Sequence, residues 1–335
     1  MKAPATQAAD RDRWPSGLVD IPAAELPPGG QAQFVRAGDG ARLRVAVWRP
    51  ASAGASVLLM PGRTEFIEKY GEVIGELMER GFAVGVMDWR GQGLSARLLS
   101  DPLRGHIDDF DTHVGDFAAM AAGPFASLPK PWIILAHSMG ANIATNILLA
   151  MPDVARAAVF IAPMYAILTG KFPAGVARLI ANGTLIGLKG RYVPGGTPTT
   201  ILEETFAENI VTHDERRHAR SRLIAEAEPR LALASPTIGF VRAAFAACDR
   251  ISAPGRPEGL ALPIFAAVAG EERLIDNAAA RAVLARMPQA EVLEFAGARH
   301  EILMETDTIR NKFWSAFDTF LARTGLAGQG SRGTA

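Results

Sequence analysis

The sequence has almost no cysteine and no excess of charge of either sign. Its 335 residues contain one cysteine, Cys248, which excludes an intramolecular disulfide framework and argues against a cysteine-rich metal site. Lys and Arg number 35, Asp and Glu number 35, and the formal net charge is +0. Because a basic surface excess is the usual mark of nucleic-acid binding, we expect no such partner. We also expect neither a metal nor a cofactor.

The first thirty residues hold no apolar core, so they do not resemble a secretory signal. The run from Pro131 to Pro152 has no Asp, Glu, Lys or Arg, and its 22 positions would suffice for a membrane helix. It contains His137, Ser138 and Asn142, however, and a strand followed by a buried helix explains it better. We expect a cytoplasmic protein that is able to contact a membrane surface.

Apolar runs and helical patterns alternate along most of the chain. Strands are predicted over 33–36, 43–48, 56–60, 82–87, 132–136, 157–162, 263–268 and 291–295, and helices over 66–78, 110–120, 139–150, 277–287 and 309–321. The first two strands flank Gly38-Asp39-Gly40, which is typical of a hairpin. Uninterrupted apolar strands that alternate with helices indicate an α/β fold, with a mostly parallel sheet covered by helices on both faces.

The alternation stops between residues 164 and 235, where Gly-punctuated apolar stretches precede a charged stretch. We interpret 164–235 as an insertion over the sheet edge. The core is then formed by 31–163 and 236–323. Residues 1–30 are expected to be a flexible arm, and 324–335 a flexible tail.

The strongest chemical signal is Ala136-His137-Ser138-Met139-Gly140, which lies between a predicted strand and a predicted helix. A serine on such a tight turn is held in a strained backbone conformation, with its hydroxyl at the open end of the sheet. Gly140 allows the strand and the helix to approach closely. The turn also directs the amide of Met139 toward the space above Ser138, where it can hold an oxyanion.

A serine needs a base to act as a nucleophile. His300 follows the last predicted strand, at the carboxyl end of the sheet where catalytic groups of α/β proteins gather. His106 is in a loop and is the competing candidate. His137 is expected to point away from the serine and to have a packing role. His113 lies in a helical pattern and is expected to be a solvated or core histidine, whereas His213 and His218, in the charged insertion, are expected to be solvated.

An acid must orient the base, and the loop after the strand that ends near Ala269 offers two. Glu272 and Asp276 are both placed to accept a hydrogen bond from His300. Asp276 could instead interact with the N-terminus of the next helix, and Glu272 could be a solvated loop charge. The residues alone leave the two alternatives open.

Two further turns contribute to this edge of the sheet. The turn Pro61-Gly62-Arg63 follows a strand, and the amide of Arg63 is the candidate second oxyanion donor, because proline has no N–H. The loop 88–95 is rich in glycine but lacks the three-glycine spacing of a dinucleotide site. We expect this loop to support the nucleophile.

Four segments together resemble the α/β-hydrolases of the monoacylglycerol lipase and bacterial lysophospholipase group. They are 61–66, 88–95, the serine turn 136–140 and 297–301, and the resemblance extends over about residues 31–323. It implies an α/β-hydrolase fold with a helical lid inserted after the sixth strand. That insertion matches 164–235.

The resemblance also implies roles for single residues. It makes Ser138 the nucleophile, His300 the base, and the amides of Met139 and Arg63 the oxyanion donors. Three positions depart from the group's usual pattern: Ala136 replaces a glycine, Pro61 replaces a histidine, and Glu272 stands where an aspartate is common. On this resemblance Glu272 is favoured over Asp276 as the acid.

The implied function is hydrolysis of carboxylic esters through an acyl-enzyme, with lysophospholipid or monoacylglycerol lipids as substrates. The alternatives are a peptidase or thioesterase with the same triad, and a binding protein without activity on a hydrolase scaffold. The lid could supply an apolar wall for an acyl chain, from Phe172, Val176, Leu179, Ile180, Leu185 and Ile186. Basic residues that could favour an anionic membrane or a phosphate border this wall: Lys171, Arg178, Lys189 and Arg191.

Overall fold

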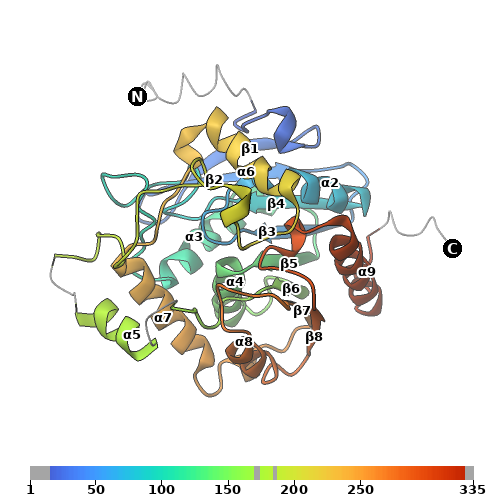
Figure 1. The fold of residues 1–335 in the computed structure, drawn as a ribbon. Helices are drawn as coiled ribbons and strands as arrows, with labels where there is room; N and C mark the ends of the chain where they lie inside the picture. The colour runs from blue at the N-terminus through green and yellow to red at the C-terminus, as the bar shows by residue number, and fades with distance from the viewer. Residues whose placement is uncertain (1–15, 170–173, 184–186, 329–335) are drawn as a thin grey trace.

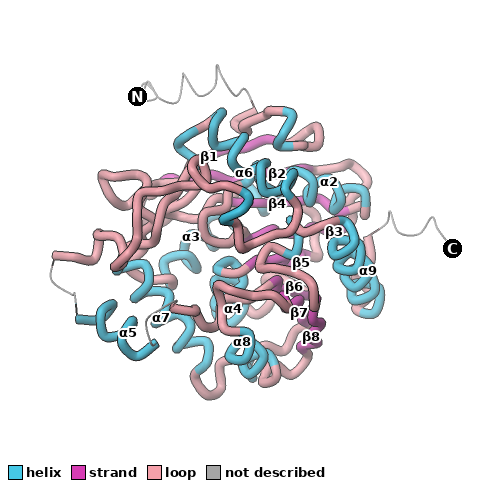
Figure 2. Tube along the Cα trace, in the orientation of Figure 1, coloured by secondary structure: helices cyan, strands magenta, loops and turns pink. Residues whose placement is uncertain are grey.

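The computed structural model describes residues 16–169, 174–183 and 187–328. The strands form one sheet of eight. Figures 1 and 2 show how this sheet crosses the molecule. The strands are β1 (Gln31–Arg36), β2 (Arg42–Trp48), β3 (Ala55–Met60), β4 (Phe82–Met87), β5 (Trp132–His137), β6 (Ala157–Ile161), β7 (Ile264–Ala269) and β8 (Ala290–Phe295). The helices are α2 (Gly71–Glu79), α3 (Asp111–Ala122), α4 (Met139–Ala150), α5 (Ala174–Gly183), α6 (Glu215–Ala227), α7 (Ile238–Ser252), α8 (Asn277–Leu284) and α9 (Asp307–Arg323). Short 3-10 helices lie between them: η1 (Pro22–Ala24), η2 (Ile67–Tyr70), η3 (Pro124–Ser127), η4 (Phe206–Glu208), η5 (Pro229–Leu231), η6 (Pro257–Gly259) and η7 (Ile302–Met304).

The strand order is β1-β2-β4-β3-β5-β6-β7-β8. β1 and β2 form the predicted antiparallel hairpin, with Val35 opposite Leu43. β2 is also antiparallel to β4, and every other neighbouring pair is parallel. The prediction of a mostly parallel sheet in an α/β fold is therefore confirmed.

Helices cover both faces of the sheet. Successive side chains of a strand point to opposite faces, so an apolar strand needs a covering layer on each side. In β3, Leu58 and Met60 pack in the apolar layer that includes α3, α4, α7 and α8. Val57 and Leu59 pack in the layer that includes α2 and α9. The two layers lie on opposite sides of the sheet in Figure 1. Both faces of the central strands are consequently buried.

Because parallel strands end at the same edge of a sheet, the residues that follow these strands come together there. The loops that follow β3, β5, β7 and β8 all begin at this edge. They carry, in order, the turn at Gly62, the serine at 138, the acidic loop at 272 and the histidine at 300.

Both chain ends differ from the prediction of flexible segments in the part that the structure describes. In the predicted arm 1–30, Leu18, Val19 and Ala24 are buried, and the amide of Val19 donates to Glu68 Oε1 over 2.9 Å. Residues 1–15 lie outside the described ranges. In the predicted tail 324–335, the Leu326 amide donates to the carbonyl of Leu321 and ends α9 in an ordered turn. Residues 329–335 are not described.

The segment 164–235 follows β6 and holds α5 and α6 (Figure 1). Its division from the core stays a prediction. α6 is attached to α2 by ion pairs, because Glu72 of α2 accepts from Arg217 at 2.6 Å and from Arg220 at 2.9 Å. Burial would raise the pKa of Glu72, but Arg217, Arg310 and Arg220 outweigh that effect and hold the pKa far below its usual value. The carboxylate is therefore ionised wherever the protein is folded near neutral pH.

The expected apolar wall of the lid differs from the structure. Leu179 is 71% exposed and Val176 is 43% exposed, so these side chains face solvent, while Phe172, Leu185 and Ile186 lie outside the described residues. Two of the expected bordering cations are paired, Arg178 with Asp249 and Lys189 with Asp108. Contact of the lid with a membrane stays a prediction.

No helix was predicted at α7, although its buried face carries large apolar side chains, Ile238, Phe240, Phe245 and Ile251. The uncharged run 131–152 is β5 followed by α4. Among the described residues, no helix combines the length and the apolar character needed to cross a bilayer.

Candidate active site

Ser138 occupies the tight turn between β5 and α4 and has the strained backbone that the sequence predicts. Its φ is 50° and its ψ is −114°, a conformation that costs a non-glycine residue free energy. Gly140 allows this turn, since a Cβ there would lie 2.2 Å from the carbonyl oxygen of Met60 at the end of β3. The turn therefore brings the serine to the edge where β3 ends.

The serine hydroxyl begins a row of hydrogen bonds with the base and the acid. Ser138 Oγ lies 2.9 Å from His300 Nε2, and His300 Nδ1 lies 2.7 Å from Glu272 Oε2. Asp276 is not part of this row. Its carboxylate instead caps α8 and accepts from the amides of Ala278 and Ala279. Of the two candidate acids, the structure joins Glu272 to the histidine.

Glu272 is held in place by its own loop. Its Oε1 accepts from the amides of Arg273 and Leu274 at 2.8 Å and 2.7 Å, which leaves Oε2 for His300. Burial alone would raise the pKa of Glu272, because the side chain is 2% exposed. The hydrogen bonds from His300 and the backbone outweigh burial and hold the pKa below its ordinary value. The side chain is an anion at neutral pH and can stabilise an imidazolium.

The amides of Arg63 and Met139 are free to bind an oxyanion. Neither has a hydrogen-bond acceptor among the described residues. For Met139 this is expected, since the first amides of a helix have no partner within it. The neighbouring amide of Gly62 is not free, because it donates to Glu65 Oε2. Among the described residues the amides of Arg63 and Met139 are thus unpaired, whereas the neighbouring amide of Gly62 is paired.

The glycine-rich loop 88–95 contacts the turn Pro61-Gly62-Arg63, which we call the oxyanion turn. This contact differs from the expected support of the nucleophile. Trp89 Nε1 donates to the carbonyl of Pro61 over 2.9 Å. Gln92 brackets the turn, since its Nε2 donates to the carbonyl of Gly62 and its Oε1 accepts from the amide of Thr64. The side chains of this loop thereby fix the residues on either side of the Arg63 amide.

The profile of the Hydrolase_4 family, described as serine aminopeptidase S33, matches residues 51–307. Lysophospholipase L2 of Escherichia coli strain K12 is 35% identical over 283 residues, which cover 80% of each chain. The chain therefore belongs to the Hydrolase_4 family. The monoacylglycerol lipase of Mycolicibacterium smegmatis is 26% identical over 273 residues, or 80% of this chain and 89% of that one.

Solved structures agree on the fold of this family member. A monoglyceride lipase from Saccharomyces cerevisiae superposes with a TM-score of 0.70 at 16% identity, over 92% of this chain and 99% of that one. The monoacylglycerol lipase of Paleococcus ferrophilus gives a TM-score of 0.65 at 20% identity, over 84% and 99%. At such identities the likeness shows the α/β-hydrolase fold alone. Together with the family membership, it makes the chain an ester hydrolase of the α/β-hydrolase group.

In this hydrolase a buried network of charged side chains lies next to the hydrogen-bonded row Glu272–His300–Ser138. No pattern in the sequence predicted this network. Glu65 Oε2 accepts from the Gly62 amide, from Tyr70 Oη at 2.5 Å and from His137 Nδ1 at 3.1 Å. Its Oε1 accepts from Lys69 Nζ at 3.0 Å. Glu65 lies in the segment 61–66 that carries the family resemblance, which was the available signal. One carboxylate therefore joins the oxyanion turn to the residue before the serine.

Both ring nitrogens of His137 face hydrogen-bond acceptors in this network. Its Nδ1 faces the carboxylate of Glu65, and its Nε2 lies 3.1 Å from the carbonyl oxygen of His300. Both partners are acceptors, so both ring nitrogens must donate. Burial would lower the pKa of His137, but the charge of Glu65 and its hydrogen bond raise the pKa above the ordinary value. Both effects favour the imidazolium form of His137, which would donate to the carbonyl of His300.

Replacing Glu65 with glutamine is expected to reduce kcat by about 10- to 100-fold with little change in KM, because it releases both the oxyanion turn and His137. Ester hydrolysis by steady-state kinetics measures this loss, and an NMR titration measures the expected fall in the pKa of His137. Glu79→Gln, at an exposed position of α2, is the control. Parental kcat together with an unchanged His137 titration in Glu65→Gln would contradict this role.

The remaining histidines do not reach the serine. His106 Nδ1 is bonded to Thr237 Oγ1 at 2.7 Å, and His113 is buried in the core. His213 pairs with Glu305 at 2.8 Å. His218 was expected to be solvated but is only 7% exposed, because α6 packs it against η4 and the ring of Phe206. No local sequence pattern indicates that burial, since it depends on contacts between separate segments.

Proposed function

We propose that this chain hydrolyses carboxylic esters of lysophospholipid or monoacylglycerol type through an acyl-enzyme on Ser138. The observation that carries the proposal is the row from Glu272 through His300 to Ser138. The row ends beside the free amides of Arg63 and Met139. The names of the relatives, lysophospholipase L2 and monoacylglycerol lipase, support the substrate class.

In the proposed mechanism Ser138 Oγ attacks the ester carbonyl while His300 Nε2 takes its proton. Glu272 keeps the other proton on Nδ1 and stabilises the imidazolium. The amides of Arg63 and Met139 bind the oxyanion, and each such donor contributes roughly 3–4 kcal/mol. His300 then protonates the leaving alcohol. In the second half it activates a water that hydrolyses the acyl-enzyme and regenerates the serine.

An apolar pocket of about 250 Å³ is the proposed site of the acyl chain. It lies between the segment after β6, α5 and α7, and we call it the acyl pocket. Its lining residues include Ile167, Ile180, Ile238, Val241 and Phe245. Burial of each methylene of an acyl chain there contributes about 0.8 kcal/mol.

The test compares an oxoester, a thioester and an amide that carry the same acyl group, together with labelling by a fluorophosphonate. We expect the highest kcat/KM on the oxoester and labelling at Ser138. Ser138→Ala should lose both labelling and turnover, whereas Ser52→Ala, at an exposed position, should keep both.

Other results would favour the alternatives. Preference for the amide would support a peptidase, which the family description, serine aminopeptidase, also names. Preference for the thioester would support a thioesterase. A folded protein that neither reacts with the probe nor turns over any of the three would be a binding protein on a hydrolase scaffold.

A further inference from the structure

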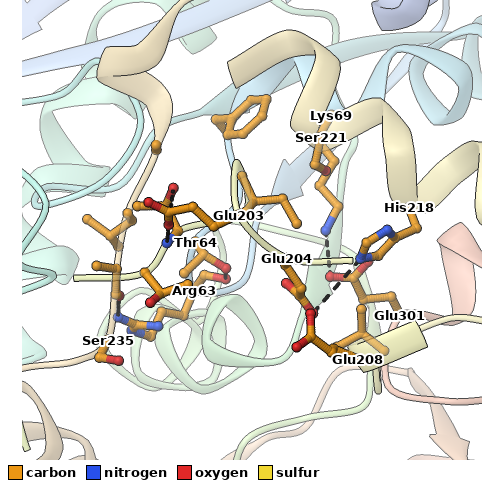
Figure 3. Close-up of a pocket in the computed structure, with 18 of the residues that line it drawn as sticks. Arg63, Thr64, Lys69, Glu203, Glu204, Glu208, His218, Ser221, Ser235 and Glu301 are labelled. Atoms are coloured by element: carbon orange, nitrogen blue, oxygen red, sulfur yellow. Dashed lines mark hydrogen bonds and ion pairs between the residues drawn. The ribbon is translucent and has the colours of Figure 1, made fainter. Parts of the chain in front are cut away.

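A second cavity, of about 470 Å³, lies between the oxyanion turn and the lid (Figure 3). We call it the polar pocket. Its charged lining residues are Arg63, Lys69, Glu203, Glu204, Glu208, His218 and Glu301. Arg63 also supplies the candidate oxyanion amide, and Glu301 follows His300 in the chain. The polar pocket therefore borders the proposed reaction centre.

At one side of the polar pocket lies a cation without an anion. The Arg63 guanidinium donates from Nη2 to the carbonyl of Ala234 and lies 5.3 Å from the ring of Phe240. Its Nε has no hydrogen-bond partner, and no carboxylate of the described ranges lies within ion-pair distance. Burial lowers the pKa of Arg63 to about 10, so the group stays charged at neutral pH. A half-buried charge without a paired carboxylate favours the binding of a counter-ion.

At the other side, acidic groups face a buried histidine, as Figure 3 shows. His218 is 7% exposed, and its Nε2 has no hydrogen-bond partner among the described residues. The nearest carboxylate oxygen, Glu204 Oε1, is 3.9 Å away, which is too far for a hydrogen bond. Glu208 accepts from Thr205, whereas Glu204 has no hydrogen bond within the described part of the chain. This side therefore presents an anion and an unsatisfied ring nitrogen.

Lys69 and Glu301 do not change this division of charge. Lys69 Nζ lies 2.5 Å from Glu301 Oε1, and it is also bonded to Glu65. The two side chains neutralise each other at the wall of the polar pocket. The charges available to a ligand are thus positive at Arg63 and negative at Glu203, Glu204 and Glu208. Of these three carboxylates only Glu204 has no hydrogen bond among the described residues.

We propose that the polar pocket is a head-group subsite that selects a zwitterionic lysophospholipid, with its phosphate at Arg63 and its ammonium at Glu204. The proposal rests on ester hydrolysis at Ser138 and names the substrate within that class. A guanidinium binds phosphate through paired hydrogen bonds, and a carboxylate binds an ammonium. The uncharged glycerol of a monoacylglycerol would leave Arg63 and Glu204 without counter-ions.

The order of the two pockets matches the order of groups in such a lipid. The acyl pocket and the polar pocket share Pro236 in their walls, so they adjoin. Along a lysophospholipid the acyl chain, ester, phosphate and ammonium follow one another. With the ester carbonyl at the Arg63 amide, the phosphate comes next and meets the Arg63 side chain. The ammonium comes last and extends toward Glu204.

The kinetic test uses three esters with the same acyl chain: a lysophosphatidylethanolamine, a lysophosphatidic acid and a monoacylglycerol. We expect kcat/KM for the first to exceed that for the monoacylglycerol by about tenfold, as for one charge-assisted contact. Glu204→Gln should lower the ratio of lysophosphatidylethanolamine to lysophosphatidic acid by about tenfold. Arg63→Gln should lower the rates of both phospholipids relative to the monoacylglycerol. Glu226→Gln, an exposed acid of α6 outside the polar pocket, is the matched control.

A binding measurement separates this proposal from the reaction itself. Calorimetry with glycerophosphoethanolamine should detect binding to the parent protein, weakened about tenfold by Glu204→Gln, and none with glycerol. Binding without any ester hydrolysis would support the subsite while contradicting the proposed function. Equal rates on all three esters, with no binding of glycerophosphoethanolamine, would overturn the head-group subsite and leave ester hydrolysis intact.

Discussion

Replacing Glu272 with glutamine is expected to lower kcat by about 10³- to 10⁴-fold with the fold intact. The amide oxygen can still accept from the amides of Arg273 and Leu274, as Oε1 does now. The amide nitrogen then faces His300 Nδ1, and a donor there requires Nδ1 to be the unprotonated nitrogen. The proton moves to Nε2, which can no longer accept from Ser138. Rapid-mixing kinetics of acylation with an aryl ester measure the loss.

Asp276→Asn is the matched control for that substitution. Asp276 caps α8, and asparagine caps helices about as well as aspartate, so stability and kcat should stay near the parental values. Circular dichroism and thermal melting establish that both variants fold. If Asp276→Asn loses more acylation rate than Glu272→Gln, then Asp276 rather than Glu272 acts on His300 during turnover.

The positions of the serine and the histidine were predictable because each depends on local sequence and on the sheet. A small-residue turn between a strand and a helix places Ser138, and a loop after the last strand places His300. The residues alone left the acid open, since Glu272 and Asp276 share one loop, and only the family resemblance favoured Glu272. The deciding factor is how that loop folds: its own amides bind Glu272, whereas the start of α8 binds Asp276.

The charged interior could not be predicted, because it depends on pairs that are distant in sequence. Glu65 meets His137 across 72 positions, and His137 meets the carbonyl of His300 across 163. A buried Glu or His has no local pattern that separates it from a solvated one. The same reason explains the wrong expectations for His218 and for residues 16–30, whose partners lie on other segments.

The largest effect on stability is expected at Arg44, which lies between two carboxylates in the interior. Its Nε lies 2.7 Å from Asp88, its Nη1 and Nη2 each lie 2.8 Å from Glu68, and all three residues are 0% exposed. Asp88 also accepts from the amides of Ile67 and Leu94, so this ion cluster organises the loops around the oxyanion turn. Arg44→Met should lower the free energy of unfolding by about 3–5 kcal/mol, because it leaves two buried anions. Urea unfolding measures the loss, and Arg49→Met, at an exposed position, is the control.

The pH dependence of this loss gives a sharper test than its size. Without Arg44, the ionised carboxylates are buried without a counter-ion, whereas the protonated acids are buried at much lower cost. Carboxylic acids of an unfolded chain ionise near pH 4, so the destabilisation by unpaired charge begins above that pH. The difference in unfolding free energy between Arg44→Met and the parent should therefore be small near pH 4 and grow toward pH 8. A difference that stays constant over this range would mean that lost packing, not unpaired charge, causes the destabilisation. In that case the cluster would contribute to the fold by its volume alone.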